Sequence, residues 1–200
     1  MYVKAWKIKL VRELNLLEYY SLSFPELADK LDREYYEPYR NICEDAIHSI
    51  LEMNKTLGTQ SPARIYTNFC LNLVFTIKHD ITERQSITLP AARALHAKNE
   101  EGHDCANCKG ACKNLGNEIN VNAIAEANNV IIDSLCRLHK LAMPAYLYTQ
   151  QPEEYKELRY KMLSVYSGLL ELFYIEESVL FAAILQLQLH RGKPKEVVPG

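Results

Sequence analysis

Glycine, proline and long apolar runs are all scarce in this sequence. Seven glycines and eight prolines among 200 residues are too few for a β-sandwich, whose short strands are joined by frequent tight turns. Glutamates interrupt the longest apolar-rich stretch, residues 169–189, and no stretch approaches the ~20 apolar residues that span a bilayer. Residues 1–10 contain recurring lysines and lack the apolar centre of a secretory signal. We therefore expect a cytoplasmic protein that is not associated with a membrane.

A dominant charge of one sign is also missing. The chain has 23 lysines and arginines against 25 aspartates and glutamates, a net charge of -2, so nucleic acid is not an expected partner. Glycine-rich phosphate loops and the nucleophile elbow of hydrolases are absent as well, and the sequence therefore identifies no catalytic residue or substrate. Its length suits one hydrophobic core, so we interpret residues 1–200 as a single domain.

Apolar residues recur at helical spacing most clearly in the C-terminal half. One stripe runs from Ile124 to Ala145 and a second from Tyr155 to Leu187, both at intervals of three and four residues. The first stripe predicts a helix that begins near residues 117–122, and the second a helix from about Pro152 to Gly192. The short connection between them predicts that the two helices are antiparallel neighbours.

The N-terminal half has the same helical pattern with more breaks. Residues 23–26 (Ser-Phe-Pro-Glu) are typical of a capped helix start, whereas Pro38 predicts a kink or a fresh start. Pro62 and Pro90 open further helices, and residues 1–20 favour a helix. Together these patterns predict an all-α protein, a bundle of four to five main helices. An irregular insert rich in cysteine and glycine, residues 102–116, separates its two halves.

The insert concentrates residues that bind metals. Three of the six cysteines and three of the seven glycines lie there, and the spacing is H-x-C-x2-C-x3-C from His103 through Cys105 and Cys108 to Cys112. Two thiolates separated by two residues can bind one metal ion, and glycines let the backbone bend around it. The nearby lysines lower the pKa of the thiols. We therefore predict a cysteine-ligated metal centre.

The identity of this centre follows from how its ligands are grouped. Structural zinc sites usually take two ligand pairs from two places in the chain, whereas a single run of three cysteines favours an iron–sulfur cluster. Cys136 or His103 is the expected fourth ligand, and Cys43 and Cys70 are further thiols that could serve. Such a cluster predicts electron transfer, redox sensing or an accessory role in a redox enzyme. A structural zinc loop on a non-catalytic interaction or regulatory bundle is the alternative, and a redox-active dithiol is another.

A third hypothesis places two metal ions in the bundle itself, as in di-iron carboxylate oxidases. Those sites use Glu-x-x-His pairs, which Glu100 and His103 match and which Asp45 and His48 approach. Glu176 lies within an apolar stripe, where a carboxylate must be paired, protonated or bound to metal. A second complete Glu-x-x-His pair is missing from the sequence.

The tyrosines suggest that helix faces form protein–protein contacts. Thirteen tyrosines, including the adjacent pairs at 19–20 and 35–36, suit helix faces that contact a protein partner or a second copy of the chain.

Overall fold

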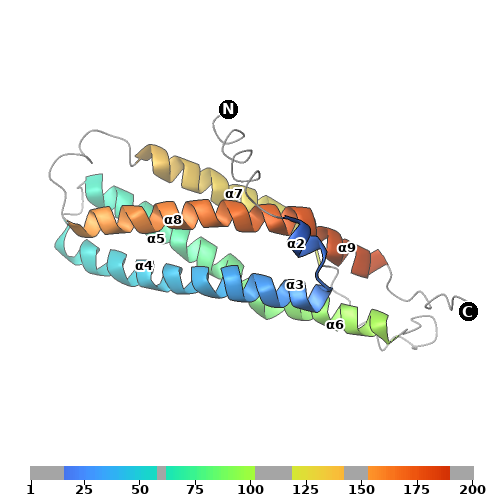
Figure 1. Cartoon of the computed structure of the whole chain (residues 1–200). Helices are drawn as coiled ribbons and strands as arrows, with labels where there is room; N and C mark the ends of the chain where they lie inside the picture. Colours follow the sequence, from blue (N-terminus) through green and yellow to red (C-terminus); the bar gives the residue numbers. More distant parts are fainter. Residues whose placement is uncertain (1–15, 58–61, 102–118, 142–152, 190–200) are drawn as a thin grey trace, which may run out of the picture.

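A computed structural model describes residues 16–57, 62–101, 119–141 and 153–189, and every structural statement below concerns these residues. All regular structure within them is helical, which confirms the all-α prediction. A short helix, α2, precedes four long helical runs that pack side by side as a bundle (Figure 1).

Three of the four long runs contain a short π-helical segment. The first run consists of α3 (Phe24–Leu31), η1 (Asp32–Tyr36) and α4 (Glu37–Thr56), and it follows α2 (Leu16–Tyr20). The second consists of α5 (Pro62–Glu83), η2 (Arg84–Thr88) and α6 (Leu89–Glu100). The third is α7 (Val121–Leu141) alone, and the fourth consists of α8 (Glu153–Ile175), η5 (Glu176–Leu180) and α9 (Phe181–Leu189).

The helices form a closed ring of neighbours. α4 packs against α5, α5 against α7, α7 against α8, and α8 against α4, while α6 contacts α3 and α9. Successive long runs point in opposite directions, so α6 and α9 end at the same end of the bundle (Figure 1). α7 and α8 are antiparallel neighbours, as the sequence predicts.

The apolar stripes read from the sequence form the core. Ile131 and Leu135 of α7, and Leu158 and Leu169 of α8, are at most 2% exposed. Each such side chain contributes about 1.5–3 kcal/mol when it leaves water, which makes these stripes the main source of stability. At the start of α3 the carboxylate of Glu26 accepts hydrogen bonds from the backbone N–H and the hydroxyl of Ser23, so the predicted capped start is confirmed.

The α-helices α4 and α6 begin one residue before Pro38 and Pro90, as the sequence predicts, but each continues directly from a π-helical segment rather than from a loop. The backbone remains helical through both positions, and a π-helical segment ends two residues before each proline. Proline offers no N–H to the preceding turn, and its ring crowds the carbonyl four residues earlier. A wider turn directly before the proline relieves that crowding. The third segment, η5, has no proline at the equivalent place, where Ala182 stands.

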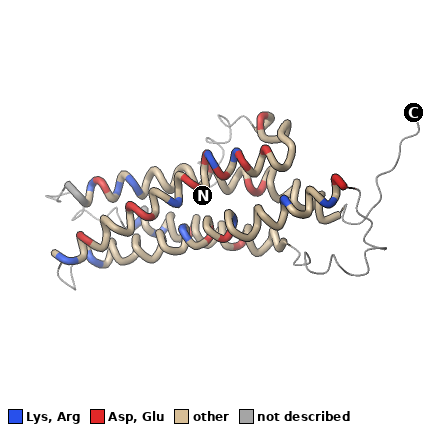
Figure 2. Tube along the Cα trace, turned by 90° about the horizontal axis from the view of Figure 1, so that it is seen from below, with Lys and Arg blue, Asp and Glu red and all other residues tan. Residues whose placement is uncertain are grey.

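The distribution of charged residues on the helices agrees with the near-zero net charge of the chain. Figure 2 shows acidic and basic residues interspersed along the helices. In the described ranges, no helix combines the length and the apolar character that crossing a bilayer requires.

Candidate functional site

The predicted ligands of the insert lie outside the described residues. Cys105, Cys108, Cys112 and His103 all fall between Glu101 and Ile119, where the description stops and resumes. The structure instead shows how the two ends of the insert are held. One end is the last turn of α6 and the other is the residue pair that precedes α7.

Both ends of the insert are bonded to the last turn of α9. The side-chain amide Nδ2 of Asn99 donates to the carbonyl oxygen of Leu187 at 2.9 Å. The side-chain amide Nε2 of Gln188 donates to the carbonyl oxygen of Ile119 at 3.2 Å. Because Leu187 and Gln188 are consecutive, Asn99 and Ile119 lie near one another at the end of α9.

The cysteines of the helices occupy different surroundings. Cys43 and Cys70 are fully buried, and burial raises the pKa of each thiol to about 12, so both remain protonated at neutral pH. Cys136 is half-buried, and its Sγ lies 3.7 Å from the hydroxyl of Tyr166. Cys136 also lies about 22 Å along α7 from Val121, at 1.5 Å per residue. Cys136, one of the two predicted fourth ligands, is therefore several helical turns from the first residue of α7.

Glu176 is at the centre of a buried polar cluster. Its Oε1 accepts hydrogen bonds from the Tyr36 hydroxyl at 2.6 Å and from Arg84 Nε at 3.1 Å, and its Oε2 accepts from Asn128 Nδ2 at 2.7 Å. Arg84 Nη2 in turn donates to Asn128 Oδ1 at 2.7 Å, which closes the cluster. All four side chains are at most 4% exposed. The sequence required a partner for a carboxylate here, and the partner is a guanidinium.

The three π-helical segments converge on this cluster. Tyr36 is the last residue of η1, and Arg84 and Glu176 are the first residues of η2 and η5. Only Asn128 comes from a helix with no such segment. π-helical turns are rare and recur at functional sites. Here each one aims one polar side chain at the same point of the core.

The electrostatics of the cluster favour one charge state. Burial, reinforced by the negative Glu176, raises the pKa of Tyr36 well above its ordinary value, so the phenol stays protonated and donates. Burial likewise raises the pKa of Asp80, although the Arg84 guanidinium opposes this. One Asp80 oxygen is buried with no hydrogen-bond partner among the described residues. The Glu176 carboxylate, by contrast, has three donors.

This donor set does not suit a dinuclear metal site. Protein donors already engage both oxygens of Glu176, and in the described part of the chain no three His, Cys, Asp or Glu side chains gather as metal ligands. Asp45 and His48 are exposed on α4, away from the buried Glu176. Glu100 ends α6, and its predicted partner His103 lies outside the described residues.

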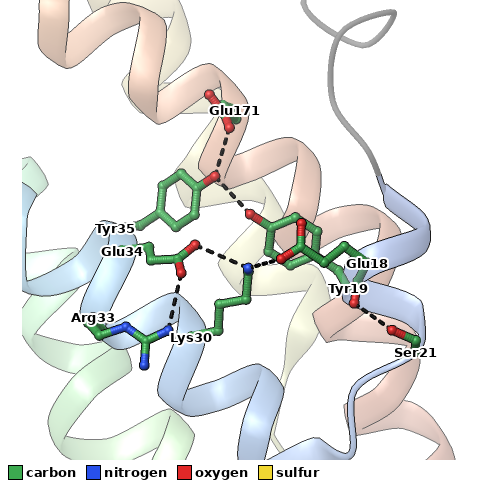
Figure 3. Close-up of polar contacts among 8 residues, drawn as sticks. All are labelled: Glu18, Tyr19, Ser21, Lys30, Arg33, Glu34, Tyr35 and Glu171. Carbon is green, nitrogen blue, oxygen red and sulfur yellow. Dashed lines mark hydrogen bonds and ion pairs between the residues drawn. The ribbon is translucent and has the colours of Figure 1, made fainter.

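A second polar cluster joins α2 to the rest of the bundle (Figure 3). The Tyr35 hydroxyl donates to Glu171 Oε1 at 2.7 Å and lies 3.1 Å from the Tyr19 hydroxyl. Lys30 pairs with Glu18, and its Nζ lies 5.1 Å from the centre of the Tyr19 ring. Adjacent tyrosines, 35 and 36, thus bind two glutamates of the last long run, which fixes the first run against the fourth.

An open groove of about 590 Å³ lies between the last turns of α4 and the first turns of α8. Apolar Met53, Leu57 and Leu158 line it together with polar His48 and Lys161.

The chain was compared with known proteins. No protein-family model, no curated protein and no solved structure matches it. Its function must therefore be argued from its own residues.

Sequence reasoning selected Glu176 and missed its three partners. Arg84 lies seven residues after Ile77 and three residues after Ile81, and Asn128 lies three residues before Ile131. Both polar residues are thus in phase with a buried stripe. Their helical spacing from buried apolar residues could have indicated that they are buried, and a buried polar side chain needs a hydrogen-bond partner.

Proposed function

We propose that this protein is a cytoplasmic helical metal-binding protein whose insert, residues 102–116, holds an iron–sulfur cluster. Cys105, Cys108 and Cys112 are the proposed thiolate ligands, and the cluster serves electron transfer, redox sensing or a redox enzyme as an accessory. The observation that carries the proposal is the grouping of three cysteines and a histidine in one loop. Both ends of that loop are bonded to α9.

The remaining cysteines support this assignment of ligands. Cys43 and Cys70 are core residues whose high pKa values disfavour the thiolate form that a metal requires. Cys136 lies several turns into α7, whereas His103 is two residues from Cys105 in the sequence, so we propose His103 as the fourth ligand. Cys43, Cys70 and Cys136 are free thiols rather than disulfides, which supports the cytoplasmic assignment.

The chemistry of the site would come from its surroundings. Lys109 and Lys113 stand next to two of the ligands in the sequence and would offset the negative charge of the thiolates. Such charges, together with hydrogen bonds to the sulfurs, set the reduction potential of a cluster. Zinc bound by the same residues would instead give a structural loop on an interaction module.

Metal analysis of anaerobically purified protein tests the proposal. We expect iron and sulfide in equal amounts and broad absorption near ~400 nm. Cys105→Ser, Cys108→Ser and Cys112→Ser should each lose the metal, and so should His103→Ala. Cys136→Ser is the matched control and should keep it.

Three other outcomes would contradict the cluster. Colourless protein with one tightly held zinc would favour the interaction module. Two irons without sulfide, retained in Cys105→Ser, would point to a site in the bundle. Wild-type protein that purifies without metal and takes up neither zinc nor iron would overturn metal binding altogether.

A further inference from the structure

The short helix α2 bridges two of the three π-helical segments. The hydroxyl of Tyr19 lies 3.1 Å from the hydroxyl of Tyr35 in η1. The hydroxyl of the neighbouring Tyr20 donates to the carbonyl oxygen of Ser178 in η5 at 3.0 Å. A single turn of helix is therefore bonded to both the first and the fourth long runs.

The hydrogen bonds on Tyr35 run in one direction. Tyr35 donates its only hydroxyl proton to Glu171 Oε1 at 2.7 Å, so the Tyr19 hydroxyl must donate to Tyr35 (Figure 3). Burial raises the pKa of both tyrosines, so both stay protonated at neutral pH. Hydrogen bonds in series polarise one another, and loss of the Tyr19 bond therefore weakens the bond from Tyr35 to Glu171.

The attachment of α2 is thin, and the helix that follows it has an anchor of its own. Tyr19 is the single buried residue of α2, whereas Leu17 is 77% exposed. The start of α3 is fixed by the capping box of Ser23 and Glu26, which involves no residue of α2. The helix α2 can therefore swing away about residues 21–22 without unwinding α3. A turn held by so few buried contacts opens at a low free energy.

Lys30 has a carboxylate partner whether or not α2 is docked. It pairs with Glu18 of α2, and its Nζ lies 5.1 Å from the centre of the Tyr19 ring. The same Nζ is 3.5 Å from Glu34, which belongs to the same long run as Lys30. Release of α2 therefore leaves Lys30 with a counterion, which keeps the electrostatic cost of opening low.

We propose that α2 is a releasable strap: when it swings away about residues 21–22, η1 and η5 loosen together and the pair of Tyr35 and Glu171 becomes exposed. The same two segments provide Tyr36 and Glu176, which meet in the buried polar cluster. The strap thus connects an exposed turn of helix to the buried charges. This inference is independent of the proposed metal site, because all of its residues lie outside the insert.

Hydrogen exchange on the full chain tests the strap through one exposed tyrosine. Tyr20→Phe deletes the bond to Ser178 in η5, and among the described residues Tyr20 has no hydrogen bond with η1. The amides of Ser21 and Leu22 close the end of α2, and we expect their exchange to become about fivefold faster. Exchange in η1 should accelerate by a similar factor. Exchange in η2 is the internal reference for overall stability, because no printed sequence position of α2 falls within it.

The control and the contrary outcomes are equally defined. Tyr160→Phe changes another exposed tyrosine and should leave exchange in α2, η1 and η5 as in the wild type. Acceleration confined to α2 and η5 in Tyr20→Phe would show two separate local contacts and would overturn the strap. Equal acceleration in η2 would show a general loss of stability, with the same conclusion. Exchange of the Ser21 and Leu22 amides only through global unfolding, with the urea dependence of the core, would also overturn it.

Discussion

The Nε of Arg84 lies 3.1 Å from Oε1 of Glu176, and each of these residues is the first of a π-helical segment. A cation and an anion from two different long runs therefore meet in the core where both backbones widen. Tyr36, the last residue of the π-helical segment η1, donates to the same oxygen. The widened turns and the buried charges therefore form one structural unit.

Removing the guanidinium should destabilise the protein strongly. Arg84→Met leaves Glu176 charged and buried without its counterion, and we expect a loss of about 3–5 kcal/mol in the free energy of unfolding. Urea denaturation measures this loss. The double variant Arg84→Met/Glu176→Met should lose less than the sum of the two single variants, because it leaves no unpaired charge.

A surface pair gives the matched comparison. Arg93 pairs with the exposed Asp29, so Arg93→Met should cost less than about 1 kcal/mol. If Arg84→Met were as mild as Arg93→Met, the buried cluster would contribute no specific stability.

Two tyrosines offer a second matched comparison. Tyr36→Phe removes a buried donor to a charged carboxylate, and we expect it to cost about 1.5–3 kcal/mol. Tyr20→Phe removes a bond to the Ser178 carbonyl at an exposed position and should cost about 1 kcal/mol or less. Thermal and urea denaturation should rank the two variants in this order, and the reverse order would show that Glu176 does not depend on Tyr36.

The buried thiols should make the fold sensitive to alkaline pH. Cys43 and Cys70 have pKa values of about 12 in the folded protein, so unfolding lets each thiol ionise near its ordinary value. The contribution of the two protonated thiols to the free energy of unfolding is therefore complete below about pH 9 and is lost as the pH rises toward 12. Each thiol should reduce the free energy of unfolding by about 1.3 kcal/mol between about pH 10 and 11.

The control for this pH dependence is a pair of alanine variants. Cys43→Ala/Cys70→Ala should have a shallower slope than the wild type in the same window, with the remaining slope due to buried tyrosines such as Tyr36, whereas Cys136→Ala should keep the wild-type slope. Urea midpoints at several pH values measure this difference. An unchanged slope in the double variant would assign the alkaline sensitivity to other groups.

Gly168 should not tolerate a side chain. A Cβ at this position of α8 would lie 1.4 Å from the hydroxyl oxygen of Tyr39 on α4. Gly168→Ala should therefore cost about 1–3 kcal/mol, although alanine favours a helix more than glycine does. Gly168→Ala/Tyr39→Ala should lose much less than the two single variants combined. Additive losses would show that the two helices are not in close contact there.

The helices were predictable where a stripe and a cap agreed. Ser23 and Glu26 mark the start of the first long run, and Ile131 of the first C-terminal stripe and Leu169 of the second are buried as expected. Pro38 and Pro90 correctly marked the starts of α4 and α6, but they did not predict the π-helical segments that precede them. A π-helical turn lets the helix continue through the proline, and no local sequence pattern predicts such a turn.

The candidate site was predictable only in part. Glu176 stood out because one carboxylate on an apolar stripe requires a partner. Arg84 did not stand out, since its neighbours Glu83 and Gln85 resemble an ordinary solvated turn. The partner of a buried charge depends on which helices meet, and that information is tertiary. The ligands of the insert stay a prediction from spacing, because they lie outside the described residues.

The contacts of Asn99 and Ile119 with consecutive residues of α9 have a consequence for the length of the insert. Since the polypeptide exits and returns at neighbouring points, the packing of the four long runs places no demand on how many residues lie between them. A short linker or an entire additional module could occupy that position with the same helical scaffold beneath it. The proximity of Asn99 and Ile119 is therefore set by their contacts with α9 and not by the length of the segment between them.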